Sequence, residues 1–346
     1  MKSVLVGMSG GVDSSVTAYL LKKDGYRVHG MSLIFWETRF NSGSNACCSV
    51  DSANDAARTA SALGISHTKR DVRVEFMQRV IEPFIAAYGA GTTPNPCILC
   101  NKFVKFPVLL EAADQMGVDY IATGHYAGVD NQRLTMAADI KKDQSYFLYV
   151  LTREILSRLL LPLGALTKDE VRAIARGLNL PAAARRESQE ICFVENCDYA
   201  KLIRDYQGGA AAEGPIVDRE GNRIGTHSGL YAYTLGQRRG IGVAAKEPLY
   251  VIGIDTAANT LTVGTRQYAA SAQCSVSDLN MIVDVDFPAQ LDVRIRSSGR
   301  AVSSVISRID EQNLRVVFSE PQWSPAPGQS AVFYDKESVI GGGVIV

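Results

Sequence analysis

Hydrophobic and polar positions follow two different patterns along this chain, and the pattern changes near residue 200. In the first half, short apolar runs such as Val4 to Val6 and Tyr120 to Thr123 alternate with longer stretches that have the composition of helices. Strands alternating with helices are typical of a parallel sheet covered by helices on both faces. The first half is therefore predicted to be an α/β domain with a doubly wound parallel sheet.

Glycine, proline and capping residues set the ends of these elements. Gly25 and Gly64 are predicted to end two helices, and Pro83 is predicted to kink a third. Thr167 to Glu170 fits a capping box that begins another helix. The expected helices are residues 14–23, 51–63, 72–88 and 102–116, the expected strands after the first are 26–33 and 120–123, and a loop rich in glycine and proline covers 89–96.

Beyond about Lys201 the apolar positions come in short alternating runs, such as residues 249–254 and 291–295, separated by glycine and asparagine turns. This pattern predicts an all-β region, made of one small β domain followed by a barrel. The predicted domains are residues 1–200, 201–272 and 273–346.

The composition is that of an ordinary globular protein, with 46% hydrophobic and 21% charged residues in 346. The longest apolar runs are far shorter than a bilayer span, and the N-terminus lacks the features of a signal peptide. We therefore expect a cytoplasmic protein without a membrane segment.

The formal net charge is zero, from 36 basic and 36 acidic residues, which argues against a non-specific nucleic-acid coat but not against a local basic groove. Solvated surface is the plainer interpretation of each basic cluster taken alone. The candidate clusters are Arg185 with Arg186, Arg238 with Arg239, and Arg294 with Arg296 and Arg300.

The most informative stretch is Ser9 to Ser15, with the sequence Ser-Gly-Gly-Val-Asp-Ser-Ser, directly after the first strand. A strand, a glycine turn and a helix in this order direct backbone N–H groups and a helix N-terminus at a phosphate-sized anion. The hydroxyl groups add donors, and Asp13 is placed to hold Mg²⁺ against a polyphosphate. No Walker-type loop occurs in the sequence, which argues against a γ-phosphate motor or switch.

The seven cysteines of a cytoplasmic chain are expected to be mostly reduced, which favours catalysis or metal binding over a disulfide scaffold. The four histidines are scattered without zinc-ligand spacing. Cys97 and Cys100 form a C-x-x-C motif, for which zinc, redox and structural interpretations compete. Isolated cysteines are by default small buried hydrophobes, so no role is assigned to Cys47, Cys48, Cys197 and Cys274.

The serine-glycine loop resembles that of the ATP pyrophosphatases, which split ATP between the α- and β-phosphates to adenylate a substrate. Together with further motifs in a fixed order, it resembles the tRNA-specific 2-thiouridylases over nearly the whole chain. These motifs are residues 93–102 and 188–193 around the cysteines, Ala122 to Tyr126, His227 to Gly240, Pro327 to Tyr334, and Gly341 to Gly343.

The resemblance implies an enzyme that exchanges O2 of the wobble uridine of tRNA for sulfur, with the oxygen leaving on AMP. It implies a persulfide on Cys192 and a catalytic Cys100 that attacks it and ends as a Cys100–Cys192 disulfide. Both thiols are expected to be partly exposed and of lowered pKa, Cys100 through Lys102 and a helix N-terminus following it. The resemblance further implies ATP contacts at Gly7, Met8, Ser9, Gly10, Gly11, Val12, Asp13, Ser14, Leu33 and Gly124, target-base contacts at Asn95, Pro96 and Cys97, and tRNA contacts at Lys142, Asp143, Gln144, Arg296 and Ser297.

Two positions depart from the family pattern. Cys97 stands where the better-known form has aspartate, and Ser297 stands where many members have an aromatic residue. Three thiols at Cys97, Cys100 and Cys192 would suit a 4Fe–4S cluster that delivers sulfide, so the persulfide and cluster routes both stay open. The implied partners are tRNAs for Lys, Glu and Gln and a sulfur donor, either a cysteine desulfurase or a relay. A monomer is the default expectation.

Two other function classes compete. An ATP pyrophosphatase that adenylates a small metabolite and transfers ammonia would explain the loop, but it would not explain Cys100, Cys192 or the β half. A non-catalytic tRNA-binding protein with a relict nucleotide site is the other, and the presence of Asp13, Cys100 and Cys192 argues against it.

Overall fold

The computed structural model describes residues 1–36, 50–184, 191–194, 198–207 and 212–346. The chain divides into two compact units. The first unit contains Met1–Val80, Cys97–Glu195 and Glu337–Ile340, and the second contains Ile81–Pro96, Asn196–Lys336 and Gly341–Val346. Some residues singled out in the sequence lie outside the described residues, namely Cys47, Cys48, Arg185, Arg186, the stretch 188–190 and Cys197.

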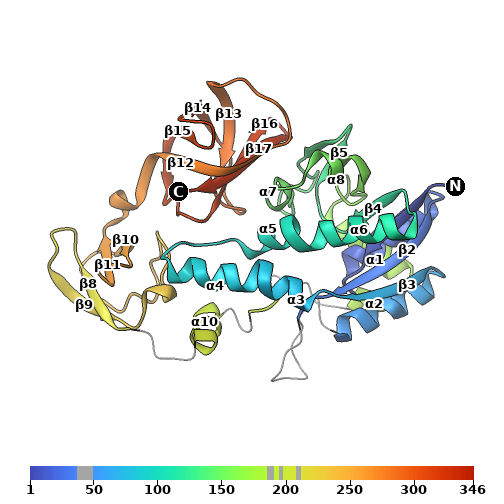
Figure 1. Cartoon of the computed structure of the whole chain (residues 1–346), viewed down its shortest axis with the longest axis horizontal. Coiled ribbons are helices and arrows are strands. Elements are labelled where there is room, and N and C mark those ends of the chain that lie inside the picture. Colours follow the sequence, from blue (N-terminus) through green and yellow to red (C-terminus); the bar gives the residue numbers. More distant parts are fainter. Residues whose placement is uncertain (37–49, 185–190, 195–197, 208–211) are drawn as a thin grey trace. The chain divides into compact units, whose positions relative to one another are not determined.

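The first unit is built on a parallel sheet with the strand order β3-β2-β1-β4-β7. Helices cover both faces of this sheet (Figure 1), so the predicted doubly wound α/β architecture is confirmed. The strands are β1 Ser3–Gly7, β2 Arg27–Ile34, β3 Ser66–Asp71, β4 Tyr120–Thr123 and β7 Leu159–Leu160, and an antiparallel hairpin outside this sheet is formed by β5 Gly128–Asp130 and β6 Arg133–Thr135.

The central strand β1 is apolar throughout because it is buried on both faces. Val4 and Val6 belong to a core cluster with Ala18 of α1 (Val12–Lys23) and with Ala56 of α2 (Val50–Ala62). The opposite face packs against α6 (Phe106–Met116), where a Cβ on Gly7 would lie 3.1 Å from the side chain of Leu109. A continuous apolar run is what a strand covered on both sides requires.

Two helical stretches of the first half are interrupted by π-helical turns. The predicted helix 72–88 consists of α3 Arg73–Phe76, a π turn at Met77–Ile81 and α4 Glu82–Gly89. Pro83 stands in the first turn of α4, directly after the π turn, and the kink predicted at this proline stays a prediction. The remaining helices are α7 Ser145–Leu148, α8 Arg153–Arg158, α9 Lys168–Gly177 and α10 Tyr199–Gln207, with 3-10 turns at Pro181–Ala184, Leu230–Ala232 and Arg266–Ala269.

The helix predicted from Lys102 begins earlier than expected. α5 spans Pro96–Cys100 and continues directly through a π turn at Asn101–Lys105 into α6. Pro96 favours this start because its fixed φ suits the first helical position. The C-x-x-C motif therefore lies on a helix that begins at Pro96, and the expected helix start at Lys102 is wrong.

The second unit holds two β structures, as the change of pattern after residue 200 predicts. The first is a sheet with the order β10-β11-β8-β9, whose core includes Ile216, Val251 and Leu261. The second is a six-stranded antiparallel barrel, β12-β15-β14-β13-β16-β17, closed by pairing of β12 with β17. The strands are β8 Gly214–Val217, β9 Arg223–His227, β10 Tyr250–Asp255, β11 Thr260–Gly264, β12 Ala270–Met281, β13 Ala289–Arg294, β14 Val302–Arg308, β15 Leu314–Trp323, β16 Ser330–Asp335 and β17 Ser338–Ile345.

No helix in the described part of the chain is long and apolar enough to cross a membrane.

Candidate nucleotide site and cysteine helix

The strand order of the first unit creates a switch point between β1 and β4, because the chain adds β2 on one side of this pair and β7 on the other. In open parallel sheets, ligands bind beyond the carboxyl ends of the strands at such a point. The loop Met8–Gly11 follows β1 there, and Gly124 to Tyr126 follow β4. The fold therefore places the serine-glycine loop where this architecture binds ligands.

The loop is shaped by its glycines and hydroxyl groups. Gly10 has a φ of 74°, a left-handed conformation that glycine adopts without strain. Gly11 is the N-cap of α1 and, having no side chain, forms no cap to the first N–H groups of the helix. The Ser15 hydroxyl donates to the Gly11 carbonyl at 2.8 Å, and the Ser9 backbone N–H donates to the Ser14 hydroxyl at 3.2 Å. This is the geometry of a loop that receives an anion on backbone N–H groups.

Gly124 packs directly against this loop. A Cβ at this position would lie 2.8 Å from the carbonyl carbon of Asp13 and from the nitrogen of Ser14, so only glycine fits. Leu33 is buried near the end of β2, the neighbour of β1. The structure thus brings together at one edge of the sheet the residues expected to bind ATP: Gly7 to Ser14, Leu33 and Gly124.

The Asp13 carboxylate forms the strongest polar cluster of this edge. The ammonium of Lys168 lies 2.7 Å from each of its two oxygens, and the Tyr126 hydroxyl donates to Oδ1 at 2.8 Å. The same ammonium lies 5.5 Å from the centroid of the Tyr126 ring. Lys168 is 6% exposed. In the sequence Lys168 stands out only as part of a capping box, and no local pattern signals this contact, which joins residues 155 positions apart.

The capping box itself is confirmed and holds the first turn of α9. The Thr167 hydroxyl accepts from the Glu170 N–H at 3.3 Å, and the Glu170 carboxylate accepts from the Thr167 N–H at 2.7 Å. The backbone and side-chain hydrogen bonds from Thr167 lower the pKa of the Glu170 carboxyl. Lys168 follows the cap directly, so its backbone position is fixed by this box.

His125 packs beside the loop as a neutral ring. Its Nδ1 lies 2.7 Å from the Thr123 hydroxyl, and the ring stacks on Phe106 with centroids 5.7 Å apart. Burial, and secondarily the charge of Lys105, lowers the pKa of His125 well below its usual value. Lys105 Nζ lies 3.4 Å from Nε2. A neutral ring that accepts at Nε2 carries its proton on Nδ1.

The three cysteines of interest have different environments. Cys97 is exposed, Cys192 is half-buried and Cys100 is buried, and each is a free thiol. The expectation that Cys100 is partly exposed is wrong. No helix begins after Cys100, because α5, the π turn and α6 run on without interruption. The nearest helix N-terminus is at Pro96, so Cys97 in the first turn lies closest to it.

The described side chains do not form the cluster site that the sequence suggests. Within the described residues, no three His, Cys, Asp or Glu side chains come together as a metal site, and this holds for Cys97, Cys100 and Cys192. Both oxygens of Asp13 accept from Lys168, and Mg²⁺ at this carboxylate stays a prediction. We therefore derive no step through a 4Fe–4S cluster or through a metal on Asp13.

The segment expected to contact tRNA beside the nucleotide site is largely engaged within the protein. The buried Asp143 carboxylate accepts from the N–H groups of Ala137 and Ser145, and from the Ser145 hydroxyl at 2.9 Å. Gln144 accepts from the Tyr126 N–H at 2.9 Å. These contacts give Asp143 and Gln144 an internal role, tying the segment to the loop after β4, while the adjacent Lys142 is half-buried.

The other expected contact residues lie on two elements. Asn95 is half-buried, and the boundary between the two units passes between Pro96 and Cys97. In the barrel of the second unit, the Arg296 guanidinium donates to the Ser324 carbonyl at 3.3 Å, and Ser297 is exposed.

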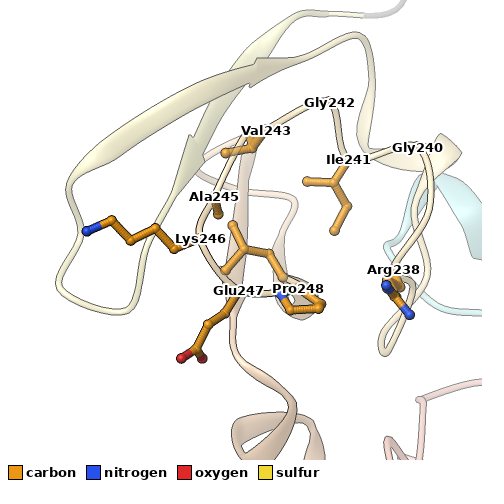
Figure 2. A pocket seen from close by; sticks show the side chains of 10 residues that line it. Arg238, Gly240, Ile241, Gly242, Val243, Ala245, Lys246, Glu247 and Pro248 are labelled. Atoms are coloured by element: carbon orange, nitrogen blue, oxygen red, sulfur yellow. The ribbon is translucent and has the colours of Figure 1, made fainter.

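The second unit also has a pocket of about 360 Å³ within a single loop, lined by residues 238 and 240–249. Figure 2 shows the loop curving around it, with Ile241 and Pro248 toward its centre and the charged ends of Lys246 and Glu247 directed outward. A pocket formed by one loop, with its charged side chains directed outward, has few convergent polar groups, so no ligand is assigned to it.

Comparison with known proteins identifies the family. A family model described as the tRNA methyl transferase HUP domain matches residues 2–196, and models described as a PRC-barrel domain and an aminomethyltransferase beta-barrel domain match 200–265 and 255–345. A tRNA-specific 2-thiouridylase MnmA from Geotalea uraniireducens is 43% identical over 99% of this chain and 95% of that protein. This chain belongs to the tRNA-specific 2-thiouridylase family.

Two other members of the 2-thiouridylase family match equally completely. The protein from Acetivibrio thermocellus is 43% identical over 99% of both chains, and the one from Carboxydothermus hydrogenoformans is 42% identical over 99% of this chain and 97% of its own. The methyl transferase wording of the domain descriptions differs from these names. We follow the relatives, because they match the whole chain and are named for a reaction.

Proposed function

We propose that this chain is a tRNA sulfurtransferase that converts uridine to 2-thiouridine at the expense of ATP. The observation that carries the proposal is the 42–43% identity, over 99% of the chain, to proteins named tRNA-specific 2-thiouridylase. The serine-glycine loop at the switch point and the presence of Cys100 and Cys192 support it, because the reaction needs a nucleotide site and thiols.

The first step activates the base. Uridine O2 attacks the α-phosphorus of ATP, an O2–P bond forms, and the bond to the departing pyrophosphate breaks. Adenylation is needed because a uracil carbonyl oxygen is a poor leaving group, whereas AMP is a good one. The loop Met8–Gly11 and the N-terminus of α1 supply backbone N–H groups for the phosphates.

The second step transfers sulfur. The terminal sulfur of a Cys192 persulfide attacks C2 of the adenylated uridine, and AMP leaves. The Cys100 thiolate then attacks Sγ of Cys192, which releases the 2-thiouridine and forms a Cys100–Cys192 disulfide that a thiol reductant opens.

The finer assignments extend the same proposal. Asn95, Pro96 and Cys97 contact the flipped-out target base, and the exposed Cys97 replaces an acid/base carboxylate of the better-known form. The residues that contact tRNA are Lys142, Asp143, Gln144, Arg296 and Ser297. The substrates are the tRNAs for Lys, Glu and Gln, the sulfur comes from a cysteine desulfurase or a relay, and the protein works as a cytoplasmic monomer with three domains.

The test is formation of 2-thiouridine on unmodified tRNA with ATP, followed by nucleoside mass spectrometry and by release of AMP. Chelator-stripped protein with a persulfide donor is compared with protein reconstituted with iron and sulfide. Activity in the stripped protein is the expected result. Activity only in the iron-loaded protein would replace the persulfide route by the cluster route, and no thiouridine in either sample would overturn the proposal.

Cysteine variants test the residue assignments. Cys100→Ala and Cys192→Ala are expected to abolish thiolation while leaving tRNA binding near normal. The matched control is Cys274→Ala, since burial raises the pKa of the Cys274 thiol to about 12 and leaves it protonated at neutral pH. Full activity in either of the first two variants would contradict the sulfur route.

A further inference from the structure

Lys168 is a buried cation at the nucleotide loop to which neither the family resemblance nor the motifs assign a role. It is the first residue of α9, and α9 packs against α1 through Val16, Val171 and Ala175. This packing brings the N-terminus of α9 beside that of α1. Asp13, in the first turn of α1, pairs with Lys168 across the gap.

The first position of a helix is unfavourable for a buried lysine unless another interaction of its ammonium offsets the cost. The N-terminal end of a helix carries partial positive charge, which repels an ammonium, and burial of the ammonium costs further free energy. A buried ion pair is often no more stable than an apolar pair of similar volume. Two groups hold the ammonium in place, since Asp13 and Tyr126 contact each other as well as Lys168.

The loop itself lacks the cation that a polyphosphate requires. Residues 7–15 include no lysine or arginine, and their one charged residue is the acidic Asp13. In phosphate loops of the Walker type, a lysine inside the motif balances this charge. Here the ammonium that lies at the loop comes from another helix, 155 residues later in the chain.

We propose that Lys168 binds the β- and γ-phosphates of ATP and stabilises pyrophosphate as it leaves, with Asp13 and Tyr126 as its positioning residues. This rests on the proposed function for the identity of the nucleotide. An ammonium has three N–H donors, so it can bridge the carboxylate and a phosphate oxygen. Its charge acts where negative charge grows on the departing pyrophosphate when the P–O bond breaks.

The test compares binding of α,β-methylene-ATP, which the loop cannot cleave, with binding of AMP. Lys168→Met is expected to weaken binding of the triphosphate analogue about 10- to 100-fold and to leave AMP binding unchanged, because a hydrogen bond to a charged group is lost only with the longer ligand. Lys168→Arg should retain part of the affinity. The control is Arg176→Met, which removes an exposed charge from the same helix.

A second variant separates ligand binding from support of Asp13. In Asp13→Asn/Lys168→Met neither partner leaves a buried charge unpaired, so the loop keeps its fold, and the analogue still binds weakly. Wild-type affinity for the analogue in this double variant would overturn the proposal, since Lys168 would then serve only to neutralise Asp13. Equal losses for AMP and analogue in Lys168→Met would overturn it as well.

These outcomes are independent of the proposed reaction. A wild-type protein that binds the analogue through Lys168 but forms no 2-thiouridine would leave the inference standing and would contradict the proposed function. If the wild-type protein thiolates tRNA while Lys168→Met retains full affinity for the analogue, the proposed function would stand and the inference about Lys168 would be contradicted.

Discussion

At the scale of single residues, His125 shows how a half-buried ring next to a cation changes its proton affinity. The pKa of His125 is held well below its usual value of 6.5 by burial and by Lys105. The unfolded chain therefore binds a proton at this ring below about pH 6.5, whereas the folded chain does not. Folding stability contributed by this ring is present above that pH and is lost as the pH falls.

The His125→Gln variant tests this assignment. Between pH 6.5 and 5, the free energy of unfolding of the wild-type protein should fall more steeply than that of the variant, by up to about 1.4 kcal/mol per pH unit. Urea unfolding at several pH values measures both slopes. His67, whose pKa is lowered by burial and by Lys69, contributes equally in the two proteins. Identical slopes would mean that the ring takes up its proton in the folded state.

Residue roles were predictable where a local motif carries them and not where the fold assembles them. The two glycines of the loop predict a tight turn in the sequence, and Gly10 has the left-handed conformation of such a turn. Gly124 packs closely against the backbone of Asp13 and Ser14. Lys168 meets Asp13 only because α1 and α9 pack together. The carboxylate of Asp143 accepts from backbone N–H groups, which a sequence does not reveal, and its contact with tRNA stays a prediction.

At the scale of elements, the caps of α8 and α9 form a matched pair. Thr152 caps α8 by accepting from the Ile155 N–H, and Thr167 caps α9 in the same way. Thr152→Ala and Thr167→Ala should each lower the free energy of unfolding by about 1 kcal/mol. Only Thr167→Ala should also weaken binding of the triphosphate analogue, several-fold, because Lys168 is the next residue.

Denaturant unfolding and equilibrium binding on the two variants give both quantities. Equal affinities for the analogue in Thr152→Ala and Thr167→Ala would show that the cap of α9 does not set the position of the ammonium. A loss of affinity in Thr152→Ala would point to general destabilisation of the first unit instead.

The elements differ in how clearly the sequence predicts them. β1, α1 and β4 carry strong apolar patterns and glycine stops, and they occur where the patterns place them. The start of α5 was missed because the prolines at 94 and 96 suggest a loop, although proline is also favoured in the first turn of a helix. The π turn after Cys100 has no sequence signature, so the continuity of α5 with α6 was not predictable.

At the scale of the whole molecule, the two compact units are expected to respond differently to a bound nucleotide. The expected ATP residues, Lys168 and Tyr126 all belong to the first unit. We expect calorimetry to resolve two unfolding transitions. α,β-methylene-ATP should raise the midpoint temperature of only one of them. At a free concentration 100 times its Kd, the analogue should stabilise that unit by about 2.7 kcal/mol. A single transition that shifts as a whole would contradict independent unfolding.

The order of the domain motifs along the chain was enough to predict the family, an α/β half and two β structures. The division into compact units was not predictable, because Ile81–Pro96 joins the second unit and Glu337–Ile340 joins the first. Such exchanges depend on contacts between residues far apart in the chain. The three-domain division at residues 200 and 272 stays a prediction.

The place of Glu337–Ile340 has a consequence for the order of events during synthesis. Ser338 of β17 pairs with Thr135 of β6, and the Glu337 carbonyl accepts from the Met136 N–H at 2.8 Å. These partners leave the ribosome about 200 residues apart, so the edge of the β5–β6 hairpin stays without this partner until Glu337–Ile340 has been synthesised. A nascent chain of shorter length therefore carries an exposed strand edge, and synthesis of Glu337–Ile340 supplies the last segment of the first unit.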